Sequence, residues 1–429
     1  NTAVGLSALV ANTTGEQNTA VGAISMDANT TGSFNSSIGY NSLGANTTGA
    51  RNAALGYSAL GVNTTGDFNV AVGMYSLDAN TTADNNTAVG YQSLTANTTG
   101  TNNTAVGHDA LTANTTGIKN VCVGSDAMLV STTGDENTAL GYGALQVNTT
   151  ADDNVAVGST TLFANTTGSS NTAVGKSALK ANTTANNNTA VGSSALFTNT
   201  TGAENTALGL NTLYATTTGL NNTGLGSQAG TSVTTGGQNT IVGRAAGLNV
   251  TTGSNNLLLG SDAGRTGSPG GIVSTNSNVL VLGDENIAQA FTQVSISATS
   301  DERDKTDFVG LDLGLDFVKA LEPVTYYWDK RSKYGDKTAD DYDLNAQTPD
   351  GTHKEDWMDV GFKAQSVQTL EEAAGYKVSD KKNLTVTLSE DGKQYGLKYD
   401  RFVPILVKAI QEQNALITAL TARIETLEG

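Results

Sequence analysis

The chain has 429 residues, a net charge of −17 at pH 7 and one cysteine, Cys122. The acidic balance argues against nucleic acid as a partner, because no basic stripe is present to replace phosphate counterions. One cysteine excludes an internal disulfide framework, and no apolar run approaches the ~20 residues that cross a bilayer. Residues 1–299 hold 6 Lys/Arg and 15 Asp/Glu, against 17 and 25 in the last 130, which indicates two modules.

A strict 17-residue repeat fills residues 1–265. Its leading asparagine recurs sixteen times, from Asn1 to Asn256, without an insertion. Such a period is typical of a solenoid, in which each repeat is stable only against its neighbours. Because the chain opens inside a repeat, we expect further chain before Asn1.

The repeat columns predict a mainly β fold. The fifth position is always glycine, the fourth always Val, Ile or Leu, and the third mostly alanine. Thr-Ala-Val before a glycine is typical of a short strand with alternating side chains, and Asn-Thr-Thr-Gly supplies turn residues. Frequent Gly, Asn and Thr argue against a helical solenoid. We therefore expect a parallel β-roll about 75 Å long, at ~4.8 Å per rung.

One aliphatic column with small residues makes a thin core for a single chain. We expect three chains to share the column that begins at Val4, with the alanine column permitting close approach at a threefold axis. The rungs resemble the head repeats of trimeric bacterial autotransporter adhesins, whose pattern is Asn-(Ser/Thr)-x-(Val/Ala)-(Ile/Val)-Gly. Residues 239–253 look closest. The resemblance covers residues 1–265 and implies a trimeric β-roll fibre.

No catalytic, cofactor or metal site is expected in the repeats. Cys122 occupies the alanine column, which predicts a small packed residue, and His108 is expected at the surface with no second metal ligand nearby. The Asn-Thr-Thr turns contain glycosylation sequons, which we interpret as unmodified turn ladders. No pair of carboxylates recurs in a cleft, so no glycan-cleaving site is indicated.

Residues 266–299 form a transition between the modules. The period stops after Gly264, and a loop-like segment, RTGSPGGIVSTNSN, follows. The next segment, NVLVLGDENIAQAFTQVSISA, predicts two further apolar strands. Directly after it, five of the six residues from Ser300 to Lys305 are ionisable.

Ser300 and Lys305 are a candidate nucleophile and base. A serine hydroxyl needs a group that takes its proton, and the module's only histidine, His353, lies in a polar insertion. A lysine serves when its surroundings favour the neutral amine, and Lys305 is close enough in sequence to fold back on Ser300. The serine would attack the carbonyl of Thr299 through a five-membered ring, and water would then cleave the resulting ester.

The same segment, SDERDK, matches the Ser-Asp-x-Arg-x-Lys signature of the intramolecular chaperone auto-processing domains. LDFVKALEPVTYYWD, DVGFKAQSV and YGLKYDRFVPILVKAIQEQ follow in the right order. Residues 300–429 therefore resemble this self-cleaving family of phage tailspikes and tail fibres, with a longer polar stretch at 331–356 as the departure.

The resemblance implies a small α+β domain that cuts the chain between Thr299 and Ser300, with Lys305 as the base. Asp301 and Arg303 are expected to hold the turn or a contact between subunits.

The end of the chain predicts a trimeric coiled coil over about 401–428. The alternative is a single amphipathic helix packed on its own domain. Two rows of residues spaced by seven form the heptad seam: Val403, Ile410, Ile417 and Ile424, with Leu406, Gln413, Leu420 and Leu427 between them.

Together these patterns predict a homotrimeric fibre, a phage tail fibre or tailspike shaft located in the virion tail. Its C-terminal chaperone would set the register of the three chains, whose parallel β-pairing is otherwise slow and prone to slip, and would then be released. The alternative is a bacterial cell-surface adhesin or extracellular filament matured by the same cut. We expect the chain itself and a host-surface receptor, a glycan or surface protein, as partners.

Overall fold

The computed structural model describes residues 1–287, 290–293, 296, 300–336, 341–389 and 391–428. The chain divides into two compact units. The first comprises residues 1–263 and 274–280, and the second residues 264–273 and 281–429. Within the described ranges, no helix has the length and apolarity that a bilayer crossing requires.

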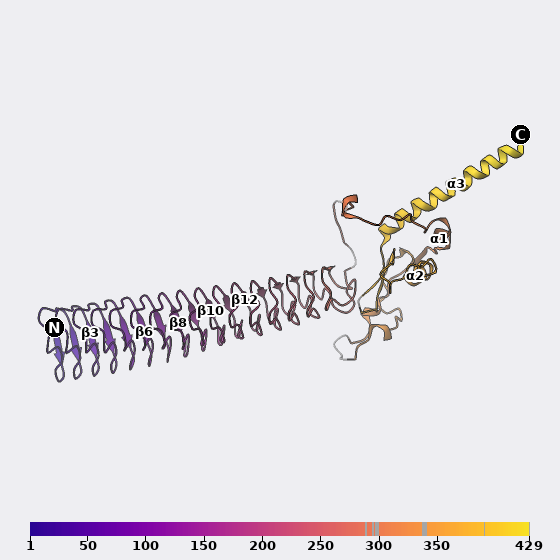
Figure 1. Ribbon diagram of the computed structural model, residues 1–429. Coiled ribbons are helices and arrows are strands. Elements are labelled where there is room, and N and C mark those ends of the chain that lie inside the picture. Colours follow the sequence, from indigo (N-terminus) through magenta and orange to yellow (C-terminus); the bar gives the residue numbers. More distant parts are fainter. Residues whose placement is uncertain (288–289, 294–295, 297–299, 337–340, 390, 429) are drawn as a thin grey trace. The chain divides into compact units, whose positions relative to one another are not determined.

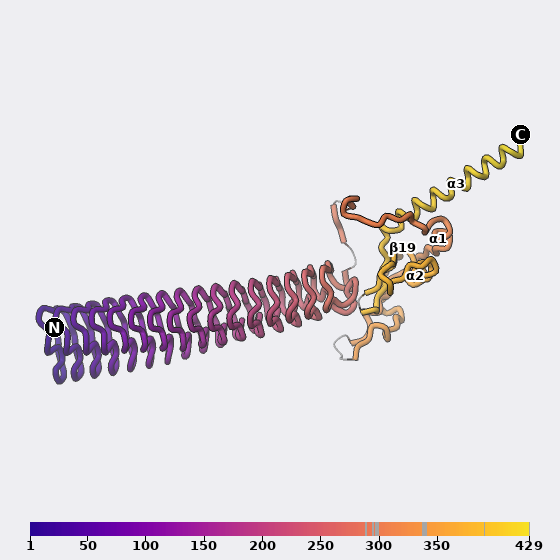
Figure 2. The backbone as a smooth tube through the Cα atoms, viewed as in Figure 1, coloured from indigo at the N-terminus to yellow at the C-terminus, as the bar shows by residue number. Residues whose placement is uncertain are grey.

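The first unit is a parallel β-solenoid with 17-residue rungs, as the repeat predicted (Figure 1). Each rung contributes one three-residue strand that pairs in parallel with the strand of the next rung, so that Thr138 lies opposite Val155. Figure 2 shows the chain winding through successive coils of similar outline.

Strands β1 to β16 occupy the same three positions in the sixteen rungs, and β17 follows after the period has stopped. They are β1 (Thr2–Val4), β2 (Thr19–Val21), β3 (Ser36–Ile38), β4 (Ala53–Leu55), β5 (Val70–Val72), β6 (Thr87–Val89), β7 (Thr104–Val106), β8 (Val121–Val123), β9 (Thr138–Leu140), β10 (Val155–Val157), β11 (Thr172–Val174), β12 (Thr189–Val191), β13 (Thr206–Leu208), β14 (Thr223–Leu225), β15 (Thr240–Val242), β16 (Leu257–Leu259) and β17 (Leu280–Leu282).

Of the two strands predicted after the repeats, β17 is one. The other was predicted between 283 and 298, where the described residues, 283–287, 290–293 and 296, contain no strand and the rest lie outside the described part of the chain.

The interior of the coil is filled by the third and ninth repeat positions. Ala139 and Leu145 are both 0% exposed, and their equivalents in most rungs are buried as well. The alanine column therefore lies inside each chain, and the expectation that it lines a threefold axis is wrong. The aliphatic fourth position faces outward, because successive strand residues point to opposite sides: Val4 is 58% and Leu55 47% exposed.

The last rungs fill the same interior with different residues. The ninth position becomes glycine, as at Gly247, while the third position becomes Ile241 and then Leu258. A Cβ atom at Gly247 would lie 3.0 Å from the Cδ1 atoms of both Ile241 and Leu258. The larger side chains at the third position fill the space that the ninth-position leucine occupies in earlier rungs.

The fifth-position glycines are required where each strand ends. Gly141 has φ +137°, a conformation that side chains disfavour, and a Cβ there would lie 2.6 Å from the carbonyl oxygen of Gly158. The rungs approach each other too closely at this column for any side chain.

Two buried asparagine ladders connect the rungs. At the first position, the backbone N–H of Asn154 donates to Oδ1 of Asn137 at 3.0 Å. At the twelfth position, Nδ2 of Asn182 donates to Oδ1 of Asn165 at 2.8 Å. All four asparagines are 0% exposed. The sequon asparagines of the Asn-Thr-Thr turns are therefore ladder residues whose amides are engaged within the fold.

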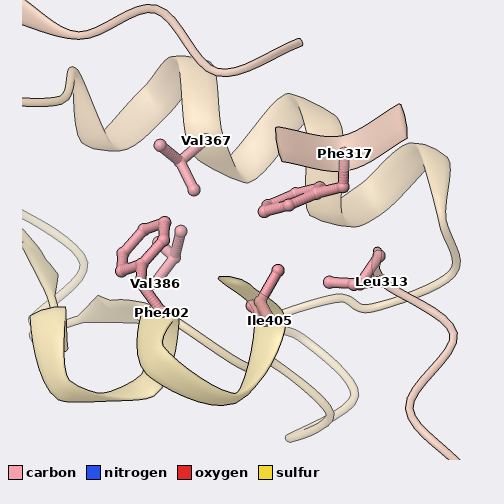
Figure 3. Packing of buried hydrophobic residues seen from close by; sticks show 6 residues of the cluster. All are labelled: Leu313, Phe317, Val367, Val386, Phe402 and Ile405. Carbon is pink, nitrogen blue, oxygen red and sulfur yellow. The ribbon is translucent and has the colours of Figure 1, made fainter. Parts of the chain in front are cut away.

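The second unit is a small α+β domain with two antiparallel strand pairs, β18 with β19 and β20 with β21. Figure 3 shows the core, to which both ends of the domain contribute. It contains Leu313, Phe317, Val367, Val386, Phe402 and Ile405. The elements are η1 (Glu302–Asp304), α1 (Leu315–Ala320), β18 (Val324–Tyr326), η2 (Arg331–Lys333), η3 (Leu344–Ala346), β19 (Asp359–Gly361), α2 (Ala364–Ala373), β20 (Val386–Leu388), β21 (Tyr395–Leu397), η4 (Tyr399–Arg401) and α3 (Phe402–Glu428).

Helix α3 packs on its own domain over its first turns, where Phe402, Ile405 and Ala409 are buried and the Glu412 side chain accepts a hydrogen bond from the Leu315 backbone. Beyond that point its apolar side chains face outward over most of its 27 residues. The exposed heptad residues are Val403, Leu406, Ile410, Ile417, Leu420, Ile424 and Leu427. The single-domain alternative therefore accounts for the first turns of the helix and leaves the predicted seam uncovered.

Candidate cleavage site

A single 3₁₀ turn, η1, organises the charged segment at the candidate site. Asp301 begins the turn, and its Oδ1 accepts hydrogen bonds from the Arg303 backbone N–H at 2.9 Å and from Nε at 3.0 Å. Its Oδ2 accepts from Nη2 at 2.6 Å. These bonds hold the pKa of Asp301 below its ordinary value and raise the pKa of the Arg303 guanidinium. The pair ties the side chain of Arg303 to the start of the turn.

The turn brings Lys305 back onto Ser300. The backbone N–H of Lys305 donates to the Glu302 carbonyl at 3.1 Å and ends the turn. The Lys305 Nζ then donates to Ser300 Oγ at 2.5 Å and to the Ser300 carbonyl oxygen at 3.2 Å. The predicted nucleophile and base are therefore within the distance that proton transfer requires. Thr299, the other predicted partner in the scissile bond, lies outside the described residues.

The arrangement has the geometry of a serine activated by a lysine. In the single chain both Ser300 and Lys305 are exposed, and Nζ acts as the donor. For catalysis the hydrogen bond must reverse, so that a neutral amine accepts the hydroxyl proton while Oγ attacks a carbonyl carbon. The distance already suits that exchange, and the missing element is a setting that favours the neutral amine.

His108 has nearer neighbours than the sequence indicated. Its Nδ1 lies 3.1 Å from Asp109 Oδ2, and with Asp126 three possible metal-ligand atoms lie within 4.8 Å of one another. The expectation of no second ligand nearby is therefore wrong. His108 is exposed and its ring stacks on Tyr91, so it is a surface residue, as the sequence predicted.

Cys122 is a packed residue, as its place in the alanine column predicted. It is 0% exposed, and burial raises the pKa of its thiol well above the ordinary value. The thiol is therefore neutral at physiological pH and a poor nucleophile.

The described part of the polar insertion is organised around Tyr334. Its hydroxyl donates to the Asp329 carboxylate at 2.8 Å and accepts from the backbone N–H groups of Asp350 at 3.2 Å and His353 at 3.3 Å. The His353 ring meets the Tyr334 ring edge-on, with centroids 4.8 Å apart. This histidine therefore takes part in the packing of the insertion.

Two features of the second unit were not predicted. Glu412 on α3 accepts a hydrogen bond from the backbone N–H of Leu315 at 2.7 Å, at the start of α1. Phe308 and Val309, a few residues after the candidate base, are 68% and 89% exposed. In the sequence, the apolar pair interrupts the charged segment and could have been noticed there. Nothing in the heptad pattern indicated that Glu412 accepts a hydrogen bond from Leu315.

A family comparison identifies the region that begins at the candidate nucleophile. Residues 300–376 match the family model described as chaperone of endosialidase. This chaperone region starts at Ser300 and follows a repetitive β-solenoid, in agreement with the resemblance found in the sequence. The searches of curated proteins and of solved structures found no match.

Proposed function

We propose that the chain is the subunit of a homotrimeric fibre that cuts its own backbone between Thr299 and Ser300. The observation that carries this proposal is the 2.5 Å contact between Lys305 Nζ and Ser300 Oγ, at the first residue of the chaperone region. Asp301 and Arg303 support the turn that makes the contact.

The reaction is an N-to-O acyl shift followed by hydrolysis. Lys305, as the neutral amine, takes the hydroxyl proton while Ser300 Oγ bonds to the carbonyl carbon of residue 299. The C–N bond then breaks, and the Ser300 nitrogen receives a proton and becomes a free amine. Water hydrolyses the ester, leaving a carboxylate on residue 299 and the restored serine hydroxyl.

Two exposed apolar surfaces support assembly of three parallel chains. One is the fourth-position column of the solenoid, which begins at Val4 and includes Leu55 at 47% exposure. The other is the seam of α3, where Ile417 and Ile424 are each 53% exposed. Contiguous exposed apolar surfaces mark sites of association, and heptad spacing favours a coiled coil.

Trimerisation and self-cleavage serve one purpose in this proposal. Trimerisation through the second unit sets the register of three repetitive chains, which non-local β-pairing alone would reach slowly. Removing the chaperone afterwards closes the route back to the unfolded state and gives the fibre kinetic stability. The fibre is a phage tail fibre or tailspike shaft in the virion tail, and its partner is a host-surface receptor.

The test is self-cleavage of the purified full chain without added protease. Wild-type protein is expected to yield fragments of 299 and 130 residues on a denaturing gel. Ser300→Ala removes the nucleophile and Lys305→Arg cannot readily supply a neutral base, so both are expected to remain whole. Lys319→Arg, at another exposed lysine of the same unit, is the matched control and should be cut normally. Cleavage of Ser300→Ala at the wild-type rate would exclude the proposed dyad.

A further inference from the structure

Three possible metal ligands gather at the corner of the solenoid that follows strands β7 and β8 (Figure 1). His108 and Asp109 occupy the sixth and seventh positions of one rung, and Asp126 occupies the seventh position of the next. One nitrogen of the histidine and one oxygen of each carboxylate all lie within 4.8 Å of one another. Among the described residues, no other three histidine, cysteine or carboxylate side chains are arranged in this way.

The backbone holds these three residues in place. The Asp126 N–H donates to the His108 carbonyl at 3.0 Å, and the Asp109 N–H donates to the Tyr91 carbonyl at 3.0 Å. The φ angle is +55° at Asp109 and +58° at Asp126, a left-handed conformation that aspartate and asparagine tolerate better than most residues. The His108 ring stacks on the Tyr91 ring, with centroids 5.2 Å apart. The cluster is therefore built on fixed backbone positions, which lowers the ordering cost of binding a ligand.

The cluster carries more negative than positive charge. Two carboxylates share one imidazole, which supplies at most one positive charge. In the same two columns, the rung before the cluster carries Tyr91 and Gln92 and the rung after it Tyr142 and Gly143, none of them charged. Among the described residues, Oδ1 of Asp109 is buried without a hydrogen-bond partner, which is costly for a polar atom. A cation bound by this carboxylate would offset that cost.

Another corner of the solenoid shows how a similar arrangement is neutralised within the chain. Arg244 and Asp262 occupy the sixth and seventh positions of successive rungs, as His108 and Asp126 do. Arg244 Nη2 lies 2.5 Å from Asp262 Oδ2, and the seventh position of the first of these rungs is Ala245. There a permanent guanidinium pairs with one carboxylate. At His108 a second carboxylate is present, and the residue facing it is a metal ligand.

We propose that His108, Asp109 and Asp126 bind a divalent transition-metal ion of the zinc type and thereby tie two successive rungs together. An imidazole nitrogen with two carboxylate oxygens suits Zn²⁺, which binds both donors at about 2.0–2.2 Å. Ca²⁺ and Mg²⁺ prefer oxygen ligands alone, so the histidine favours the transition metal. Rotation of the exposed imidazole and of the two carboxylates brings the ligand atoms to this spacing, and water completes the coordination. The inference is independent of the proposed self-cleavage.

The test is zinc binding to the purified full chain after treatment with a chelator. Equilibrium dialysis against Zn²⁺ should find one saturable site per chain. His108→Gln, Asp109→Asn and Asp126→Asn should each weaken the affinity at least about tenfold, because even the loss of an outer-shell partner commonly costs that much. Asparagine tolerates the left-handed backbone, so the aspartate variants keep the fold. His353→Gln removes the chain's other histidine and is the matched control, which should bind as wild type does.

Hydrogen exchange shows whether the ion joins the rungs. With free Zn²⁺ at about 100 times its dissociation constant, an opening that breaks the site should become about 100-fold rarer. Peptides covering residues 104–126 should therefore exchange much more slowly, while those covering residues 172–225 should not change. Ca²⁺ at the same concentration should protect residues 104–126 far less.

Any of four results would overturn the inference. Wild type that takes up no more Zn²⁺ than His108→Gln would show that the cluster is a hydrated ion pair. An equal loss of binding in His353→Gln would place the zinc site elsewhere. Equal protection by Ca²⁺ would show that the histidine is not a ligand. Bound Zn²⁺ with unchanged exchange would show that the ion does not tie the two rungs.

Discussion

Ser131 interrupts the asparagine ladder at the twelfth repeat position, and Ser131→Asn is expected to stabilise the solenoid locally. In an intact rung, Nδ2 of Asn114 donates to Oδ1 of Asn97 at 2.9 Å. Serine is too short to continue the chain of bonds. Among the described residues, Oδ1 of Asn114 is left buried without a partner, and Asn148 reaches Ser131 Oγ only at 3.5 Å. An asparagine at this position restores the contacts on both sides.

The expected gain follows from what the interruption costs. A buried acceptor without a partner costs about 1–3 kcal/mol, and a restored hydrogen bond contributes about 0.5–1.5 kcal/mol. We expect a local stabilisation of about 2 kcal/mol, which corresponds to roughly thirtyfold in an opening equilibrium. Thr216→Asn is the informative comparison. It gives Asn199 Oδ1 a donor, but the next rung carries Val233, so the new side-chain oxygen stays unpaired and the gain should be smaller.

Hydrogen exchange on the full chain measures this effect, because it reports local opening. Peptides covering residues 114–148 should exchange roughly thirtyfold more slowly in Ser131→Asn, by the factor worked out above. Ser193→Asn, on the exposed surface of another rung, should change nothing. Unchanged or faster exchange in Ser131→Asn would mean that the ladder oxygen is already hydrated or that the longer side chain does not fit, and would refute the reasoning.

Gly141→Val is expected to impair assembly far more than Thr149→Val, because a Cβ at Gly141 would lie 2.6 Å from a backbone oxygen of the next rung; equal yields of assembled fibre would contradict this. Ile417→Asp with Ile424→Asp should give monomers by light scattering and leave the chain uncut, since charges cannot occupy a coiled-coil seam; monomers that cleave normally would separate cleavage from assembly. Cys122 should resist thiol reagents at neutral pH in the native chain and react after denaturation, because burial raises the pKa of its thiol and keeps it protonated; rapid native labelling would show that the rung opens.

The sequence by itself determined every feature that depends on contacts between residues at a fixed spacing along the chain. A strict 17-residue period implies that equivalent residues of successive rungs pair, as Thr138 and Val155 do. The glycine column marked the close approach of the rungs, because only glycine lacks the atom that would collide there. Heptad spacing over 401–428 anticipated the helix Phe402–Glu428 for the same reason. The short spacing from Ser300 to Lys305 anticipated their contact.

The tertiary structure alone decided which side of each strand faces inward. Alternation in Thr-Ala-Val predicts two faces but does not say which is buried, and the aliphatic face was taken for the core. The coil interior is already filled by the ninth position, as at Leu145, so only a small residue such as Ala139 fits opposite, and valine is turned outward. The solvation of Lys305 could likewise not be predicted from the sequence. The short spacing explains why Lys305 contacts Ser300, but the exposure of both side chains to water depends on how segments distant in the sequence fold around them.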